Sequence, residues 1–433
     1  MKEAQGDHKI PYVPPWSRIS KVLTRDGGIL FTTRIARLFA YGFLSVILVL
    51  YLAQAGLSET EIGLLLTLTL IGDTAISLWI TTNADRIGRR RMLVVGACLM
   101  VFAGILFALT RDFVLLLIAG TIGVISPSGY EVGPFLSIEQ AALSQIVPNG
   151  ERTRTFAWYN LVGSFTTALG SLAGGALVQG LMNFGMNPIG SYRVIVIGYA
   201  AFGLILGLLF TQLSPSVEIP PKTGAPGSLP KSGGFLGLHR SRNVVLKLSA
   251  LFSLDAFAGG FVLQSILAYW FHVRFKVQPA LLGSIFFGAN VLAGISALTA
   301  ARIASKIGLI RTMVFTHIPS NILLILVPFM PNLPLAIAVL LMRFSISQMD
   351  VPTRQSYTMA VVDPDERSAA AGITGIARTT GSSLSPILAG PLLANTALMS
   401  MPFILSGGLK IIYDLLLYRS FRAVKPPEEA GPK

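Results

Sequence analysis

The chain has 433 residues, of which 52% are hydrophobic and only 12% are charged, and its formal net charge is +14. Soluble domains carry about 25% charged residues, so this composition argues against a soluble enzyme, a disordered chain and a coiled coil. The single cysteine, Cys98, rules out disulfides within the chain and any multi-cysteine metal site. We therefore expect an all-α polytopic membrane protein.

Apolar stretches divide the sequence into about twelve predicted transmembrane helices, because a spanning helix needs about 20 apolar residues. Helices are expected since the backbone must satisfy its own hydrogen bonds in hydrocarbon, and no alternating barrel pattern is present. In chain order, the predicted spans are 29–53, 61–82, 92–109, 113–135, 155–180, 192–212, 246–270, 279–300, 312–330, 333–352, 368–392 and 397–418.

The segment between the sixth and seventh spans is rich in Pro, Gly and Ser, which is typical of a flexible linker. We therefore expect two pseudo-symmetric six-helix bundles. The expected domains are a cytoplasmic N-tail (1–28), an N-terminal bundle (29–213), a cytoplasmic linker (214–242), a C-terminal bundle (243–420) and a cytoplasmic C-tail (421–433).

Lysine and arginine gather in the tails, the linker and alternate short loops such as Arg86–Arg91 and Arg302–Arg311. The positive-inside rule then predicts that both termini and the linker lie in the cytoplasm. The excess of basic residues therefore indicates which side of the membrane each loop lies on. We expect a multi-pass protein of the cell membrane without a nucleic-acid partner.

The two halves of the sequence repeat each other weakly, in the same order and at nearly one offset. The paired basic loops keep the same side of the membrane, so the sequence predicts a parallel repeat of six spans. The matching segments are Ala84–Arg91 with Ala304–Arg311, Glu151-Arg152 with Glu366-Arg367, and the neighbourhoods of Arg37 and Asp255.

The loop between the second and third spans carries the motif Asp85-Arg86-Ile-Gly88-Arg89-Arg90-Arg91. This motif resembles the signature loop of the major facilitator superfamily, Gly-x-x-x-Asp-Arg-x-Gly-Arg-Arg/Lys. Together with the second copy, the linker and twelve spans, the resemblance covers the whole chain. It implies a secondary transporter in which two helix bundles rock about a site near the middle of the membrane.

The resemblance also implies a cytoplasmic gate between the halves. In relatives, the carboxylate equivalent to that of Asp85 contacts the N-terminus of span 11, where the helix dipole favours an anion. In this chain, that helix start lies near Asp365–Ala369. Arg89 can pair with a carboxylate at the inner end of span 4, and Glu139 is the candidate. The alternative is that the arginines only set topology. The candidate gate residues are Asp85, Arg86, Gly88, Arg89, Glu139, Glu151, Arg152 and Arg367.

Charged residues inside spans cost about 2.5–3.5 kcal/mol each at the bilayer centre, so they usually face a partner or a wet cavity. We expect Arg37, Glu131 and Asp255 to border the inner cavity as a switchable ion-pair network, with fixed packing pairs as the alternative. Asp73, near mid-membrane, is a further candidate for carrying a proton. These four residues are the coupling candidates.

Other polar residues in the spans are candidates for the substrate cavity, namely Arg34, Gln264, Asn290, Arg343, Asp350 and Arg378. Arg343 and Arg378 lie near mid-depth and could attract an anionic substrate group. Lys410 and Asp414 are four residues apart on one helix and predict a local pair. His317 is expected to be a hydrogen-bonded packing residue.

The sequence as a whole predicts secondary active transport of a small organic solute, coupled to protons, with export favoured. Gly170, Gly174 and Gly175 partly match the span-5 glycine pattern of proton antiporters, although small-residue packing explains them equally. Uptake of a sugar or anionic metabolite remains open, as does a transporter-like sensor without transport.

The absence of known catalytic motifs argues against an enzyme: the sequence lacks a phosphate-binding Gly-x-x-x-x-Gly-Lys-Ser/Thr loop, a His-Glu-x-x-His motif and a dinucleotide fingerprint. The expected partners are a small-molecule substrate, a proton and the lipid bilayer. No cofactor and no metal are expected, and we expect a monomer.

Overall fold

The computed structural model describes residues 24–131, 133–148, 151–218, 238–363 and 366–424, and within these ranges the chain forms helices and no β-strand. Eight of its helices are long and apolar enough to cross a membrane, and a bent pair would make a ninth. Further pairs of shorter helices follow one another and are consistent with twelve crossings. The all-helical fold is therefore confirmed. The expectations for the outer tails and the linker interior, 1–23, 219–237 and 425–433, lie outside the described residues.

The N-terminal half begins with a bent pair of helices and ends with a long hairpin. Within this half, the strongest contacts are those between α2 and α8 and between α5 and α9. They are α2 (Arg25–Ser45), α3 (Leu48–Gln54), α4 (Glu59–Ile87), α5 (Arg89–Leu109), α6 (Phe113–Ile122), α7 (Phe135–Ile146), α8 (Arg152–Asn183) and α9 (Pro188–Thr211), followed by the short turn η2 (Pro215–Val217).

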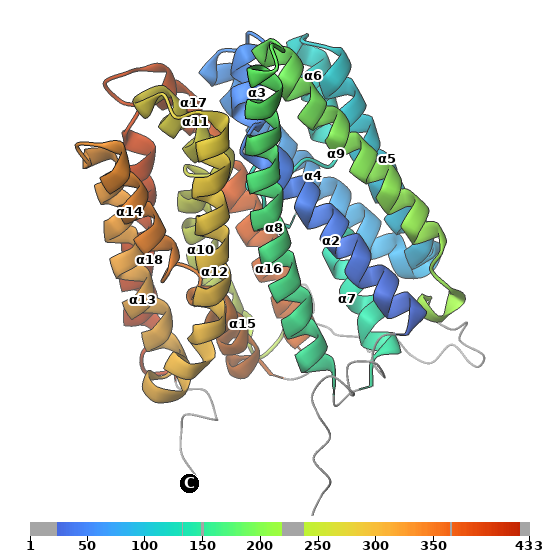
Figure 1. Ribbon diagram of the computed structural model, residues 1–433. Helices are drawn as coiled ribbons and strands as arrows, with labels where there is room; N and C mark the ends of the chain where they lie inside the picture. Colours follow the sequence, from blue (N-terminus) through green and yellow to red (C-terminus); the bar gives the residue numbers. More distant parts are fainter. Residues whose placement is uncertain (1–23, 132, 149–150, 219–237, 364–365, 425–433) are drawn as a thin grey trace, which may run out of the picture.

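The C-terminal half repeats this pattern, and α10 packs on α16 while α13 packs on α18. In Figure 1, α13, α14 and α18 lie at one side of the molecule and α5, α6 and α9 at the other. The elements are α10 (Arg242–Gly260), α11 (Gln264–Phe275), α12 (Pro279–Ile307), α13 (Leu309–Leu326), η3 (Val327–Phe329), α14 (Leu333–Phe344), α15 (Asp350–Val361), α16 (Arg367–Ser383), α17 (Pro386–Ala394) and α18 (Met401–Phe421).

The internal repeat is visible in the way matching helices end and begin. Gly88 separates α4 from α5 with φ 116°, and Gly308 separates α12 from α13 with φ 88°. This left-handed region favours glycine, so both turns need that residue. Glu151 and Glu366 occupy the N-cap positions of α8 and α16. The repeat read from the sequence is thus confirmed at the level of individual residues.

Several predicted spans are interrupted helices. The spans predicted at 29–53, 246–270 and 368–392 break briefly at 46–47, 261–263 and 384–385, and two others also have corrected boundaries. The span predicted at 113–135 breaks at 123–134, where Gly129 and Gly133 have φ 73° and 80°, and helix resumes as α7 as far as Ile146. The span predicted at 333–352 breaks at 345–349 and continues to Val361. Pro352 lies in the first turn of α15, where proline is tolerated. Asp350 and Arg354 consequently lie deeper than a span end.

In the described part of the chain, the closest packing between the two halves lies toward one end of the molecule and reaches the middle of α8 and α12, where a Cβ at Gly294 would lie 3.3 Å from the Ser164 Cβ. We call the end at which α2 begins and α18 ends the tail end, and the opposite one the far end. At the far end α8 packs on α12, and α4 packs on α17. A Cβ at Gly175 would lie 2.2 Å from the Pro279 carbonyl oxygen, and one at Gly63 would lie 2.4 Å from that of Pro386. Glycine therefore permits the close approach of these helices.

Candidate functional site

A cluster of buried charges occupies the interior of the N-terminal half. Arg37 on α2 binds Glu139 on α7 through both terminal nitrogens, at 2.7 and 2.6 Å. Its Nε also donates to Glu131 at 2.9 Å, and Arg34 Nη1 donates to the other oxygen of Glu131 at 2.9 Å. Two arginines thus meet two carboxylates, and Arg37 and Glu139 are fully buried. Such bidentate geometry offsets much of the cost of burying charge.

Neighbouring groups complete this N-half cluster. The hydroxyl of Tyr159 on α8 donates to Glu139, and Thr33 Oγ1 donates to the same carboxylate at 3.0 Å. Arg34 lies 4.2 Å above the Tyr159 ring and donates from Nε to the Tyr159 carbonyl oxygen at 2.6 Å. Glu131 comes from the non-helical break in the fourth span. The cluster therefore ties α2, α7, α8 and this break together.

A second cluster occupies the interior of the C-terminal half. Asp255 on α10 accepts from Lys410 Nζ at 2.6 Å and from Arg354 Nη1 at 3.1 Å, and the same Arg354 nitrogen contacts Asp350 at 3.0 Å. Beside them, His317 Nδ1 lies 2.9 Å from Asp414. This C-half cluster joins α10, α13, α15 and α18.

The structure corrects two predicted pairings. Arg37 and Asp255 do not share one network, because each is satisfied by partners inside its own half. Lys410 and Asp414 do not form a local pair, since Lys410 binds Asp255 and Asp414 binds His317. In both cases tertiary partners take the place of the expected ones. His317 is hydrogen-bonded, as expected.

The candidate gate residues at the tail end contact their own half rather than the other. Arg89 donates from Nε to Asp85 at 2.9 Å and from Nη1 to Gln145 at 2.8 Å. The expected pairing of Arg89 with Glu139 is therefore not present, because Glu139 is taken up by Arg37. The Asp85 side chain is 58% exposed. The expected partner region of Asp85 includes Asp365, which lies outside the described residues.

The remaining gate candidates lie at helix ends, three of them at helix starts. Glu151 is the N-cap residue of α8, and Thr155 donates to its carbonyl oxygen at 2.9 Å. Arg152 begins α8, and Arg367 begins α16 and is exposed. Arg86, also exposed, lies in the last turn of α4. Within the described ranges, none of these four side chains forms an ion pair with the opposite half.

Two glutamates at the tail end hold the linker ends instead. Glu218 accepts the backbone N–H groups of Arg89 and Arg90 at 2.7 and 3.0 Å, at the start of α5. Glu366 accepts the backbone N–H groups of His239, Arg240 and Ser241 at 2.8, 2.8 and 2.9 Å. Burial alone would raise the pKa of Glu366, but these hydrogen bonds lower the pKa to about 2. Glu366 therefore stays charged at neutral pH.

Polar contacts between the halves lie at the far end. Gln264 on α11 donates from Nε2 to Ser45 at 2.8 Å and to Ser171 at 3.2 Å, and its oxygen accepts from Asn290 at 3.0 Å. The predicted cavity residue Gln264 thus joins the two halves, and Asn290, also a predicted cavity residue, holds the Gln264 side chain from within the C-terminal half. Ser265 N also donates to the Pro127 carbonyl oxygen at 3.1 Å.

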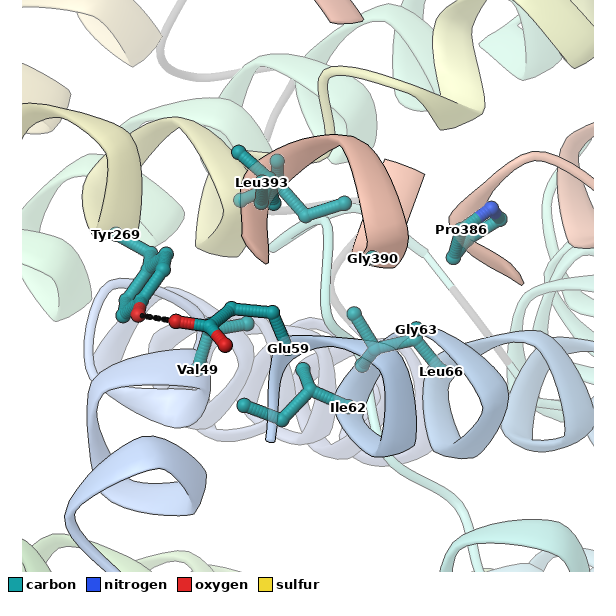
Figure 2. Close-up of a pocket in the computed structure, with 10 residues that line it drawn as sticks. Val49, Glu59, Ile62, Gly63, Leu66, Tyr269, Pro386, Gly390 and Leu393 are labelled. Carbon is teal, nitrogen blue, oxygen red and sulfur yellow. Dashed lines mark hydrogen bonds between the residues drawn. The ribbon is translucent and has the colours of Figure 1, made fainter. Parts of the chain in front are cut away.

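A small, mainly apolar pocket lies between the halves beside Glu59 and Tyr269, whose polar groups bond to each other. Figure 2 shows the Tyr269 hydroxyl pointing to Glu59, with Gly63, Pro386 and Gly390 lining the same space. The Tyr269 hydroxyl donates to Glu59 at 2.6 Å. Nearby, the backbone N–H of Ile387 donates to Thr67 at 2.8 Å. These bonds add to the closure of the far end.

Two arginines of the C-terminal half have unmet hydrogen-bonding capacity. The Nε atoms of Arg343 and Arg378 are buried without a partner. Neither side chain forms an ion pair within the described part of the chain, although Asp350 lies within electrostatic reach of both. Tyr130 of the N-terminal half also acts electrostatically on Arg343. Arg343 therefore lies toward the interface between the halves.

Asp73 on α4 is partly buried, and its hydrogen-bonding neighbours are the Gly133 backbone and the Ser77 side chain. Ser77 Oγ lies 3.5 Å from its carboxylate, one turn along the helix. No lysine or arginine forms an ion pair with Asp73 among the residues described. This separates Asp73 from Glu131 and Glu139, which are both paired with arginine.

Sequence reasoning missed several members of these clusters. Tyr159 and Asn321, which donates to Asp414 at 3.1 Å, gave no signal, because a single tyrosine or asparagine is common in any helix. Lys410 and Asp414 stand out in the sequence as charged residues within a span, but the sequence predicts that they pair with each other. Their positions in a span, at a cost of several kcal/mol if unpaired, were a signal that each needed a partner from another helix.

Fold and site together define a polytopic membrane transporter built from two related halves. The sequence profile of the Major Facilitator Superfamily matches residues 30–386, and the chain belongs to this family, as its signature loop predicts. As a member, the protein is a multi-pass transporter of a solute rather than an enzyme.

Individual relatives are similar over different lengths. The uncharacterized membrane protein YJR124C of Saccharomyces cerevisiae is 31% identical over 429 residues, which cover 93% of this chain and 96% of that protein. A Na⁺, Li⁺, K⁺/H⁺ antiporter of Planococcus maritimus is 27% identical over 210 residues, 46% of this chain and 45% of the antiporter. The fold is also similar to that of a bacterial homolog of the human lysosomal transporter Spinster, solved in an inward-facing, unoccupied conformation, with a TM-score of 0.70, 15% identity and coverage of 95% and 98%.

Proposed function

We propose that the protein is a proton-coupled secondary active transporter that exports a small organic solute across the cell membrane by alternating access. In this proposal both termini lie in the cytoplasm, so the tail end is the inner end. The protein works as a monomer, and the substrate and the proton are its only cargo.

The observation that carries this proposal is the one-sided closure of the molecule. The contacts between halves described above, from Gln264, Tyr269, Gly63 and Gly175, all lie at the far end. The candidate gate residues at the tail end contact only their own half within the described ranges. A transporter that alternates between two states has this arrangement in one of them. The proposal therefore assigns this structure to the inward-open state.

Proton coupling has its support in carboxylates that lie inside both halves. Asp73 has no cation partner among the described residues, and Asp255 is held by two cations that a change of state can release. The similarity to a cation/H⁺ antiporter over nearly half the chain supports a proton as the coupling ion and export as the direction. Small-residue packing accounts for Gly174 and Gly175, so these glycines add nothing to the proposal.

The test is transport in proteoliposomes under an imposed pH gradient, with a panel of labelled metabolites and drugs. We expect the gradient to drive accumulation of at least one solute, and Asp73→Asn or Asp255→Asn to abolish the driven part. Gly180→Ala, which meets no atom within 4 Å, is the matched control. Unchanged driven transport in both aspartate variants contradicts their part in proton coupling. A solute that binds without any flux favours the sensor function instead.

Uptake of an anionic metabolite is the second candidate function, and the unpaired Arg343 and Arg378 favour it. A buried guanidinium without a counter-ion is costly, and a substrate carboxylate or phosphate would supply one. If this function holds, Arg343→Gln and Arg378→Gln lose transport of anionic solutes while neutral solutes of the same size are unaffected. Equal losses for both kinds of solute contradict it.

A further inference from the structure

His317 lies in the middle of α13, at a place where the helix is locally weakened. It is buried at 5% exposure, and Pro319 follows two residues later inside the helix. Proline removes one backbone hydrogen bond from a helix interior. The segment around His317 can therefore shift at lower cost than an unbroken helix.

The imidazole of His317 lies between two carboxylates of different helices. Its Nδ1 lies 2.9 Å from Asp414 Oδ1 on α18, and its Nε2 lies 4.0 Å from Asp255 Oδ1 on α10. Asn321 donates to the second oxygen of Asp414 at 3.1 Å. A neutral imidazole carries one N–H and one lone pair, so it would turn a lone pair toward one of the two carboxylates. The doubly protonated form donates to both sides.

A proton on His317 supplies the positive charge that Asp414 lacks among the charges of the C-half cluster. Asp255 and Asp350 are held by Lys410 and Arg354. Asp414 is fully buried, and in the described part of the chain it forms no ion pair with a lysine or arginine. A buried carboxylate needs a positive partner or a proton. Histidine is the side chain that supplies or withdraws such a charge near neutral pH.

Charged groups reach His317 from every side of α13. Arg343 and Arg378 act on Asp350 electrostatically, without an ion pair in the described ranges, and no three His, Cys, Asp or Glu side chains there are arranged to hold a metal ion. The groups that face His317 are Lys410, Tyr413 and Asp414 on α18, Asp350 on α15 and Asp255 on α10, with Arg354 bound to both Asp255 and Asp350. On α12, Arg302 and Lys306 lie at the tail end.

We propose that His317, paired with Asp414, is the residue that binds the coupled proton. The proposal rests on proton coupling as proposed above and names its carrier. Protonation gives Asp414 a cationic partner and adds an N–H toward Asp255. Loss of the proton leaves Asp414 without a cation and loosens the hold of α13 on α10.

A structural path connects this site to the far-end closure. Asp255 belongs to α10, which runs into α11 through a three-residue break, 261–263. The first residue of α11 is Gln264, whose side chain bonds to Ser45 and Ser171 of the other half. The position of α10 thus sets the position of Gln264. Because the described conformation has both the His317–Asp414 contact and the closed far end, protonation favours the state that is open at the tail end.

The test measures conformation, so it needs no knowledge of the solute. Spin labels are attached at Thr82→Cys on α4 and Ser305→Cys on α12, two exposed tail-end positions, in a Cys98→Ser background. Their distance is measured in lipid nanodiscs at pH 5.5 and pH 8.5. We expect the longer distance to dominate at pH 5.5, and the dependence on pH to disappear in His317→Gln. The matched control is His239→Gln, whose side chain is 43% exposed and which should keep the dependence.

The outcomes separate this inference from the function on which it rests. A pH dependence that persists in His317→Gln overturns His317 as the carrier and leaves proton coupling standing. A wild-type distance that does not respond to pH overturns both. If His317→Gln does not fold, the four histidines of the chain permit a direct measurement. ¹⁵N-histidine spectra of a variant that retains only His317 must titrate between pH 5 and 9, and a signal constant over that range overturns the proposal.

Discussion

The close approach of α8 and α12 at Gly175 offers a sharp test of the far-end closure. Gly175→Ala adds a Cβ that would lie 2.2 Å from the Pro279 carbonyl oxygen and 2.9 Å from the Gly283 Cα. Both are backbone atoms, so no flexible side chain can move aside. Overpacking of this kind costs about 1–3 kcal/mol, and it penalises only the state in which the far end is closed. The ratio of open to closed far ends should rise by about 5- to 150-fold.

Gly180 on the same helix is the matched control, because a Cβ there meets no atom within 4 Å. Alanine improves helix propensity by about 1 kcal/mol over glycine at both positions, so this gain cancels in the comparison. The probe is Ser265→Cys, at a fully buried far-end position whose hydroxyl has no hydrogen bond to lose. Its rate of labelling by a maleimide should rise in Gly175→Ala relative to Gly180→Ala. Equal rates in the two variants would refute the reasoning.

Three further outcomes follow from individual contacts. Arg37→Ala leaves Glu139 buried without its cation and should lower the free energy of unfolding in detergent by about 3–5 kcal/mol; an unchanged thermal midpoint contradicts the pairing. Gln264→Leu removes bonds to the other half and should weaken the closed far end by about 1–3 kcal/mol, seen as faster Ser265→Cys labelling. Glu366→Gln should speed hydrogen exchange at the amides of 239–241. Because the pKa of Glu366 is lowered to about 2, the clamp holds above about pH 4 and is lost as the pH falls through 2; weakening on raising the pH would contradict this.

The overall architecture was accessible from the sequence because the membrane imposes it. Spans of about 20 apolar residues, the basic loops and the Gly88/Gly308 repeat each depend on local sequence. The fourth and tenth spans were misplaced for a physical reason. Glu139 and Arg354 are polar, so a hydropathy reading ends the span before each of them. Inside the protein their charges are paired, and the helices continue.

The partners of the charged residues could not be predicted in the same way. Lys410 and Asp414 lie four residues apart, and both an internal pair and two separate tertiary partners satisfy that spacing. Only the packing of α18 against α10 and α13 decides between them. Arg37 and Asp255 also occupy matching positions in the repeat, yet each of them pairs with residues of its own half. A single sequence indicates how deep a residue lies along its helix, but it does not show which neighbouring helix or cavity the side chain faces.

Reciprocal movement at the two ends of the molecule is the most direct test of the central claim. Distances are measured on the tail-end pair Thr82→Cys and Ser305→Cys and on a far-end pair, Gln54→Cys and Gln278→Cys, in the same lipid and at the same series of pH values. Alternating access predicts that the far-end distance lengthens whenever the tail-end distance shortens. Distances that stay constant at both ends, or that lengthen together, would contradict the account.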